Sequence, residues 1–142
     1  MNGDEVIRHI LNTSKTIASV GLSTNPAKPS YGIVQYLLRQ GYEVIPVNPG
    51  AEEILGQKAY PDLLSVPRKV DVVQIFRPSG DVPPVVDQAI QIGAKVVWMQ
   101  LGISNPQAAE TARAAGLLVV MDHCMREEHI RLFGKRLFPL SA

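Results

Sequence analysis

The sequence predicts a Rossmann-like α/β fold, with a five-stranded parallel sheet flanked by helices on both faces. Short runs rich in Val and Ile alternate with amphipathic segments along the chain, which is typical of parallel strands joined by helical crossovers. Glycines end several of the amphipathic segments, as they end helices. The length of 142 residues suits one such sheet but leaves no room for a second domain. We therefore expect residues 1–142 to form one domain.

The first elements follow from capping residues and apolar spacing. Asp4 can cap a helix with apolar residues at helical spacing behind it. Residues 16–20 form a β-rich run that ends at Gly21. After a polar loop containing prolines, Ser30 is expected to cap a second helix, which Gly41 ends.

The middle of the chain contains two further strands and a long connection between them. Residues 43–47 form a strand that runs into the turn Asn48-Pro49-Gly50. The stretch 51–67 reads as a loop with a short helical piece. Residues 70–76 form the third strand, which Arg77-Pro78-Ser79-Gly80 closes.

The C-terminal part repeats the alternation. A helix opens at Asp81 or Val82, because prolines are tolerated in a first turn, and it ends at Gly93. The strand 95–99 is followed by a helix over 107–115, for which Asn105 and Pro106 form a cap and first position. The strand 117–121 and a last helix over 127–133 complete the pattern. Right-handed crossovers restrict the winding, and we expect the strand order 3-2-1-4-5.

Charge and composition exclude several classes of protein. Fourteen basic and thirteen acidic residues give a formal net charge of +1, which argues against a general grip on nucleic acid or an anionic membrane. No apolar run approaches the roughly 20 residues that span a bilayer, and residues 1–10 have no apolar signal core. Cys124 is the one cysteine, so no intrachain disulfide can form. We expect a cytoplasmic protein.

The loops at the carboxyl ends of the strands are the expected ligand site, because ligands of open parallel sheets bind there. The loop after the first strand feeds a helix N-terminus, whose free amides and dipole favour a phosphate. Lys28 and the hydroxyl groups of Ser23, Thr24 and Ser30 lie in the same stretch. A connecting loop with a capped helix is the alternative interpretation.

The residues argue against a nicotinamide cofactor. The first turn has Gly21 but lacks the G-x-G-x-x-G fingerprint. No acidic residue for the ribose hydroxyl follows the second strand before Glu52, and no arginine for a 2′-phosphate stands there. A Walker loop is absent as well, which disfavours nucleotide hydrolysis.

Five short motifs in this order resemble the family of small stand-alone CoA-binding domain proteins. This family is similar to the CoA-binding domain of the succinyl-CoA synthetase alpha subunit and of ADP-forming acyl-CoA synthetases, and the resemblance covers nearly the whole chain. The motifs are Ile17-Ala18-Ser19-Val20-Gly21-Leu22-Ser23, Val44-Ile45-Pro46-Val47-Asn48-Pro49, Val70-Asp71-Val72-Val73 with Phe76-Arg77, Val97-Trp98-Met99-Gln100-Leu101-Gly102, and Val120-Met121-Asp122-His123-Cys124.

The resemblance implies coenzyme A as the ligand and assigns contacts to the strand ends. Contacts to the phosphates and pantetheine would come from Gly21, Leu22, Ser23 and Thr24, with Lys28, Ser30 and Tyr31 nearby. Contacts to the adenosine would come from Val47, Asn48 and Pro49. The ligand would be flanked by Phe76, Arg77, Pro78, Gln100, Leu101 and Gly102.

Two departures from the synthetase pattern limit what the resemblance implies. Ala51 stands where the synthetase has a lysine, so Lys58 or Lys28 would have to meet the 3′-phosphate. The synthetase domain that carries the phosphohistidine has no counterpart in this sequence, so the ligase reaction does not follow from the resemblance.

Catalysis and metal binding have little support in the sequence. Asp122-His123-Cys124 contains a nucleophile and a base, but adjacent residues of a strand point to opposite faces. The spacing of these residues and His129 matches no zinc motif.

The leading hypothesis is a binding module for CoA or a short acyl-CoA, with no catalytic residues. The alternatives are an acyl-CoA-dependent thioesterase or transferase using Cys124 and a CoA-binding partner of a separate ligase subunit. A homodimer stays open, and so does a disulfide between Cys124 and the CoA thiol.

Overall fold

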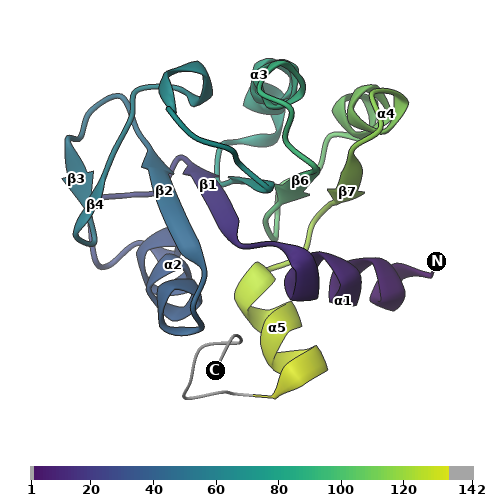
Figure 1. The fold of residues 1–142 in the computed structure, drawn as a ribbon, viewed down its shortest axis with the longest axis horizontal. Coiled ribbons are helices and arrows are strands. Elements are labelled where there is room, and N and C mark those ends of the chain that lie inside the picture. Colours follow the sequence, from purple (N-terminus) through teal and green to yellow (C-terminus); the bar gives the residue numbers. More distant parts are fainter. Residues whose placement is uncertain (1, 135–142) are drawn as a thin grey trace.

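Five parallel strands form the sheet at the centre of the computed structural model, which describes residues 2–134 (Figure 1). The predicted strands are confirmed to within two residues at each end. A short antiparallel hairpin lies outside this sheet, in the connection that was expected to be a loop. The sheet strands are β1 (Thr16–Val20), β2 (Glu43–Val47), β5 (Val72–Ile75), β6 (Val96–Met99) and β7 (Leu118–Val120), and the hairpin strands are β3 (Glu53–Ile54) and β4 (Gln57–Lys58).

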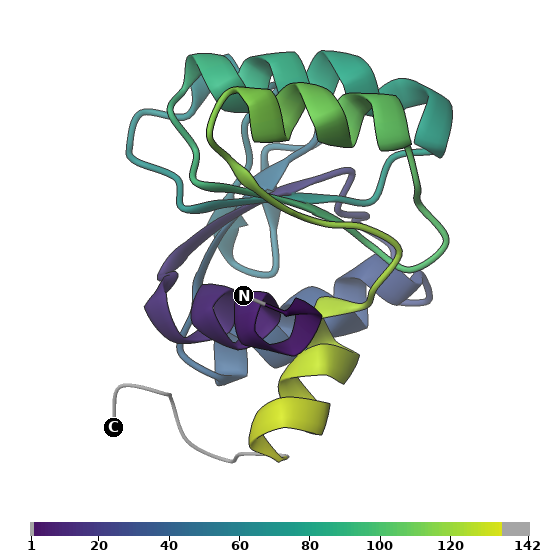
Figure 2. The same cartoon turned by 90° about the vertical axis from the view of Figure 1, so that its right-hand side faces the viewer.

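Helices cover both faces of the sheet, as the sequence predicts. One face carries α3 (Val82–Gln91) and α4 (Pro106–Ala114), and the other carries α1 (Gly3–Thr13), α2 (Pro29–Arg39) and α5 (Met125–Phe133) (Figure 2). Two single 3-10 turns, η1 (Leu63–Ser65) and η2 (Ser79–Asp81), complete the helical elements of the described residues. Between residues 2 and 134, no helix combines the length and apolar character needed to cross a bilayer.

Two of the three predicted helix caps are wrong, because both helices begin earlier than expected. Asn2, rather than Asp4, accepts the hydrogen bond from the backbone N–H of Glu5 at 2.8 Å. Lys28, rather than Ser30, precedes α2, and the Ser30 hydroxyl instead accepts from the backbone N–H of Ser23. In α1 the earlier of two cap-forming residues begins the helix. In α2 Pro29 takes the first helical position, and Lys28 before it makes no side-chain cap hydrogen bond. The Asn105 cap of α4 is confirmed.

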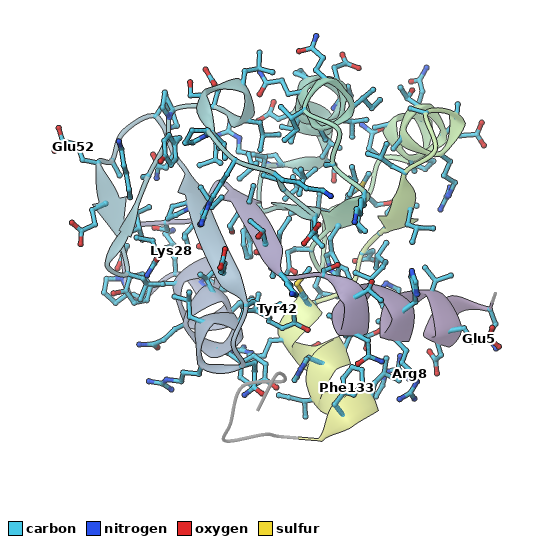
Figure 3. The ribbon with its side chains drawn as sticks, in the orientation of Figure 1. Glu5, Arg8, Lys28, Tyr42, Glu52 and Phe133 are labelled. Carbon is cyan, nitrogen blue, oxygen red and sulfur yellow. The ribbon has the colours of Figure 1, made fainter. Side chains whose placement is uncertain are left out.

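Each face of the sheet has its own apolar core, because alternate strand residues point to opposite faces. Ala18, Val73 and Val97 pack with α3 and α4. Ile17 and Val72 belong to the other core, which they share with α1, α2 and α5. At the margin of this second core, where Phe133 packs against it, the Arg8 guanidinium of α1 lies 5.5 Å from the centre of the Phe133 ring of α5 (Figure 3).

The strand order is β2-β1-β5-β6-β7, so the expected order 3-2-1-4-5 is wrong. The third strand of the sheet, β5, pairs with β1 rather than with β2. Pro46 explains why β2 is the edge: its carbonyl accepts from Tyr60 N on the outer side, so the missing N–H of Pro46 faces outward too. A proline is tolerated on an edge strand but costs a ladder hydrogen bond inside a sheet. Pro46 therefore signalled an edge strand in the sequence.

This order moves the point where the winding reverses to the junction of β1 and β5. From β1 the chain continues to β2 on one side, and from β5 it continues to β6 on the other (Figure 1). Ligands of such sheets bind in the crevice outside the carboxyl ends of these two strands. The residues that follow β1 and β5 are Gly21 and Phe76.

Candidate functional site

Gly21 and the Phe76–Arg77 backbone meet at the junction of β1 and β5. Gly21 has a φ of 89°, a backbone conformation that residues with a Cβ atom adopt only with strain. A Cβ at this position would lie 3.2 Å from Cδ of Arg77 and 3.3 Å from the Phe76 carbonyl carbon. Glycine therefore satisfies both the backbone conformation and the close approach of the two strand ends.

The loop between β1 and α2 is held by its own polar groups. The Ser23 hydroxyl accepts from Asn25 N at 3.0 Å, and the Asn25 side chain accepts from Ala27 N at 2.9 Å. Ser30 ties the end of the loop to its start through the Ser23 N–H. The backbone N–H of Ser30 itself has no hydrogen-bond acceptor within residues 2–134. The first turn of α2 thus keeps a free donor beside Lys28.

A cavity of about 600 Å³, called the central cavity below, opens between this loop, the ends of β5 and β6, and the start of α5. Seven of the predicted site residues line it: Gly21, Ser23, Lys28, Ser30, Phe76, Gln100 and Leu101. The N-termini of both α2 and α5 reach its wall. Lys28 and Arg126 are its cations, and neither forms an ion pair with a described residue. Figure 3 shows Lys28 beside α2.

A second cavity of about 460 Å³, the side cavity, shares Gly21 and Ser23 with the central cavity. Its other lining residues include Val20, Val47 and Val85 of the α3 and α4 core, whereas Ile33 and Cys124 of the central cavity belong to the opposite core. The two cavities therefore lie on opposite faces of the sheet and meet at its edge. Besides Gly21 and Ser23, four further predicted residues line the side cavity: Val47, Asn48, Pro49 and Arg77.

A third hollow of about 790 Å³, the hairpin cavity, lies against β3 and β4. Asn48 and Pro49 connect it to the side cavity, and Lys58 lines it together with Glu52 and Glu53. Lys58 Nζ lies 5.3 Å from the centre of the Tyr60 ring.

Five predicted site residues line none of these three cavities. Leu22 is fully buried in the core, and its carbonyl accepts from the Asn48 side chain at 3.0 Å. The others lie beside the cavities in the same loops or at the start of α2: Thr24, Tyr31, Pro78 and Gly102. Their contacts with a ligand stay predictions.

The central cavity also has lining residues that the sequence prediction missed. These are Pro29, Ile33, Ile103, Arg126 and Glu127, along with Cys124, which the sequence suggested as a nucleophile or a disulfide partner of the CoA thiol but not as a lining residue. The start of α5 supplies three of them. The sequence contained part of this information, because the loop after the last strand also lies at the carboxyl ends of the strands. The position of that strand in the sheet was needed to predict that the loop lies near Lys28.

A row of buried polar side chains runs from β1 to the cavity. The Ser19 hydroxyl donates to Gln74 Oε1 at 3.0 Å, and Gln74 Nε2 donates to Gln100 Oε1 at 3.2 Å. The backbone N–H of Met125 donates to the same Gln100 oxygen at 3.0 Å. Ser19 and Gln74 are fully buried and Gln100 is 2% exposed. The row links β1, β5, β6 and α5 through one set of hydrogen bonds.

Asp71 links β1 and β5 at the opposite, amino-terminal ends of the strands. Its carboxylate accepts from the backbone N–H groups of Lys15 and Thr16 at 2.9 and 3.1 Å, and Lys95 lies 3.8 Å away. Burial by itself would raise the pKa of this carboxyl group, but the backbone hydrogen bonds and the nearby lysines outweigh it and hold the pKa below its ordinary value. This group anchors β5 beside β1 far from the cavities.

Cys124 and His123 do not form a catalytic pair in the described residues. The His123 ring contacts Met121 O through Nδ1 at 2.8 Å and lies 3.7 Å from Glu128 through Nε2. Cys124 is buried and makes no hydrogen bond with a described residue. No group of three or more His, Cys, Asp or Glu residues in the described part of the chain is placed to hold a metal ion.

Comparisons with known proteins identify relatives of the whole fold. Residues 15–130 match the family described as the CoA binding domain. The uncharacterised protein YneT of Bacillus subtilis is 38% identical over 123 residues, which are 87% of this chain and 91% of YneT. A solved structure of a hypothetical protein from Pyrococcus horikoshii has a TM-score of 0.90 at 46% identity, and the match covers 94% of each chain.

An ADP-forming acetate–CoA ligase of Archaeoglobus fulgidus is 39% identical over 122 residues. The match covers 84% of this chain but 18% of the ligase. The likeness is therefore to one part of a much longer protein.

Proposed function

The chain belongs to the CoA binding domain family, and from that premise we propose that it binds coenzyme A, or a short acyl-CoA, as a binding module without a catalysed reaction. The observation that carries the proposal is the central cavity at the point where the sheet winding reverses. Two helix N-termini and two cations without ion-pair partners among the described residues face one hollow there. This arrangement suits a ligand that carries several phosphate charges.

The diphosphate is proposed to lie at the N-terminus of α2. The free N–H of Ser30 and the ammonium group of Lys28 would donate to its oxygens. The Ser23 and Asn25 hydrogen bonds hold the loop in this conformation without a ligand, so binding would cost little ordering of the backbone.

The adenosine is proposed to occupy the side cavity, between the end of β2 and Arg77. Val47 and Pro49 provide apolar contacts for the base, and the Asn48 side chain fixes the turn by accepting from Gly50 N at 2.8 Å. Lys58 lies on the hairpin that continues from this cavity, which makes it a candidate for the 3′-phosphate in place of the absent lysine at position 51.

The pantetheine arm is proposed to run through the central cavity past Phe76 and Gln100. Ile33, Phe76 and Ile103 provide apolar walls for its methylene groups. The amide of Gln100 provides a donor for a carbonyl of the arm. The ligase reaction of the longer relatives is not carried over, because the matched segment is 18% of such a ligase.

Calorimetric titration with CoA, dephospho-CoA, NAD and NADP tests the proposal. CoA should bind most tightly, and dephospho-CoA more weakly because it lacks the 3′-phosphate. Lys28→Ala should raise the dissociation constant for CoA about tenfold, since a charge-assisted hydrogen bond is lost. Lys69→Ala, a lysine that precedes β5 at the far edge of the sheet, is the matched control and should leave binding unchanged. Tighter binding of NAD than of CoA would contradict the proposal.

A further inference from the structure

Cys124 is a buried thiol with access from one side. The residue is 5% exposed, and it contributes to the wall of the central cavity. It immediately precedes α5, whose N-terminus favours negative charge. The backbone N–H groups of Arg126 and Glu127, in the first turn, have no acceptor among residues 2–134. A reagent reaches this sulfur by entering the central cavity.

Gln100 independently indicates that the cavity beside Cys124 receives a ligand. The Met125 N–H can only donate, so the atom it meets must be the amide oxygen of Gln100, and this fixes the side chain's orientation. Gln74 donates to the same oxygen. The amide nitrogen is left without a partner in the described part of the chain, although Gln100 is 2% exposed and lines the cavity. This nitrogen is not enclosed by protein atoms, so its acceptor must come from whatever enters the cavity.

The walls around this donor define the chemistry of its partner. Ile33, Phe76 and Ile103 are apolar, the Gln100 nitrogen offers hydrogen bonds to a carbonyl, and Lys28 and Arg126 carry positive charge at the helix ends. A flexible chain with amide carbonyls, a phosphate at one end and sulfur at the other meets all three requirements. A small anionic disulfide such as oxidised glutathione would bring carboxylates near Glu127 and has no phosphate for the cations.

We propose that Cys124 is a thiol–disulfide exchange site, at which CoA disulfide modifies the chain to form a mixed disulfide. The proposal rests on the proposed function, since the same cavity would hold the CoA moiety. The Cys124 thiolate attacks one sulfur of CoA disulfide. The S–S bond of the reagent breaks, a Cys124–S–S–CoA bond forms, and the second CoA leaves as a thiolate that takes up the proton released by Cys124. The disulfide is exchanged, so no further oxidant is needed.

Intact-mass spectrometry of the full chain tests this inference. Because Cys124 is the one cysteine of the sequence, any thiol adduct reports on it. Incubation with CoA disulfide should add one CoA through a disulfide, and dithiothreitol should remove it. Oxidised glutathione at the same concentration should react at least about tenfold more slowly, because it lacks the contacts that bind CoA. Gln100→Met should slow the reaction with CoA disulfide by a larger factor than the reaction with oxidised glutathione, because only the CoA reagent uses the Gln100 donor.

Calorimetry with CoA separates this inference from the proposed function. Cys124→Ser, with Cys124→Ala as a second variant of the same buried position, should form no adduct yet bind CoA within about threefold of the unmodified chain. Wild-type protein that binds CoA but acquires no adduct would overturn the exchange site and leave the proposed function standing. Equal rates with CoA disulfide and oxidised glutathione would overturn it too. Protein that neither binds CoA nor acquires the adduct would overturn both.

Discussion

The carboxylate of Asp122 accepts a hydrogen bond from the backbone N–H of Gly102 at 2.6 Å. The bond ties the loop after β7 to the loop after β6, and the backbone N–H of Asp122 strengthens the link by donating to Ile103 O. Asp122 holds a φ of 62°, which is unusual for a residue with a side chain. The pair fixes the loop that carries Gln100 and Leu101 at the central cavity.

Two replacements of Asp122 test the combined contribution of this hydrogen bond and of the backbone conformation. Asp122→Asn keeps an acceptor and a residue that tolerates positive φ, so the unfolding free energy should fall by less than about 1 kcal/mol. Asp122→Ala loses both and should cost about 1–3 kcal/mol. Urea denaturation measures the difference, and an equal loss in the two variants would contradict the expected advantage of Asn over Ala at this position.

Gly21 is expected to tolerate no side chain, for two reasons that a matched variant separates. Gly116 has a φ of 91°, close to the 89° of Gly21, but a Cβ there would meet no atom within 4 Å. Gly116→Ala should cost about 1–2 kcal/mol through strain alone. Gly21→Ala should cost about 1–3 kcal/mol more, because the Phe76 backbone must move. Chemical denaturation of both variants measures these losses, and a similar loss at the two sites would contradict the packing of Gly21 against Phe76.

Ser19 and Gln74 should behave as one unit in a double-mutant cycle. Ser19→Ala leaves Gln74 Oε1 without its donor, and Gln74→Met leaves the buried Ser19 hydroxyl unpaired. Each single change should cost about 1–3 kcal/mol of unfolding free energy. The double variant should cost about 1 kcal/mol less than the sum, because no polar group of the pair is then left unpaired. Additive losses in urea denaturation would show that the hydrogen bond contributes nothing to stability.

Asp71 should make the stability of the chain sensitive to acid. Its folded-state pKa lies below the ordinary value of about 3.9. The stabilisation is therefore present above that value and is lost as the pH falls through the lower pKa of the folded state. Asp71→Asn should lower the unfolding free energy by about 1–3 kcal/mol near neutral pH and flatten its decline below about pH 4.

The control for Asp71 is Asp87→Asn, which replaces an exposed carboxylate on α3 that makes no hydrogen bond or ion pair with a described residue. It should change stability by less than about 0.5 kcal/mol at any pH. Thermal unfolding measured across the acid range compares the two variants with the parent chain. Parallel pH curves for Asp71→Asn and the parent would contradict the assigned role.

Several site predictions depended on features that sequence patterns read well. The loop after β1 is recognisable because Gly21, the hydroxyl residues and Lys28 precede an apolar run at helical spacing. Gln100 follows a strand at its carboxyl end, and ligands of open parallel sheets bind at these ends. The orientation of the Gln100 amide could not be predicted from the sequence, because it depends on a hydrogen bond from the Met125 N–H at the start of α5.

The predicted strand order was wrong, although the sequence contained a signal for the correct one. Hydrophobic periodicity does not report that signal. Local patterns locate strands and helices, whereas strand pairing depends on which strands can form backbone hydrogen bonds to a neighbour on both sides. Pro46 removes one donor from β2, which suits an edge strand, whereas β5 (Val72–Ile75) contains no proline and can pair on both sides. Had both been weighed, β2 would have been placed at the edge and β5 beside β1.

By itself the sequence determined the elements of this protein and their type, because helix and strand periodicity, glycine stops and the Asn105 cap act over a few neighbouring residues. It also predicted a phosphate-binding loop after the first strand. Only the tertiary structure decided which strand ends meet. That choice brought Gly21 against Phe76, set the start of α5 opposite Lys28, and opened the wall of the central cavity to Cys124. The physical reason is that pairing and packing compare residues far apart in the chain, and their free energies are settled by the whole fold rather than by any one segment.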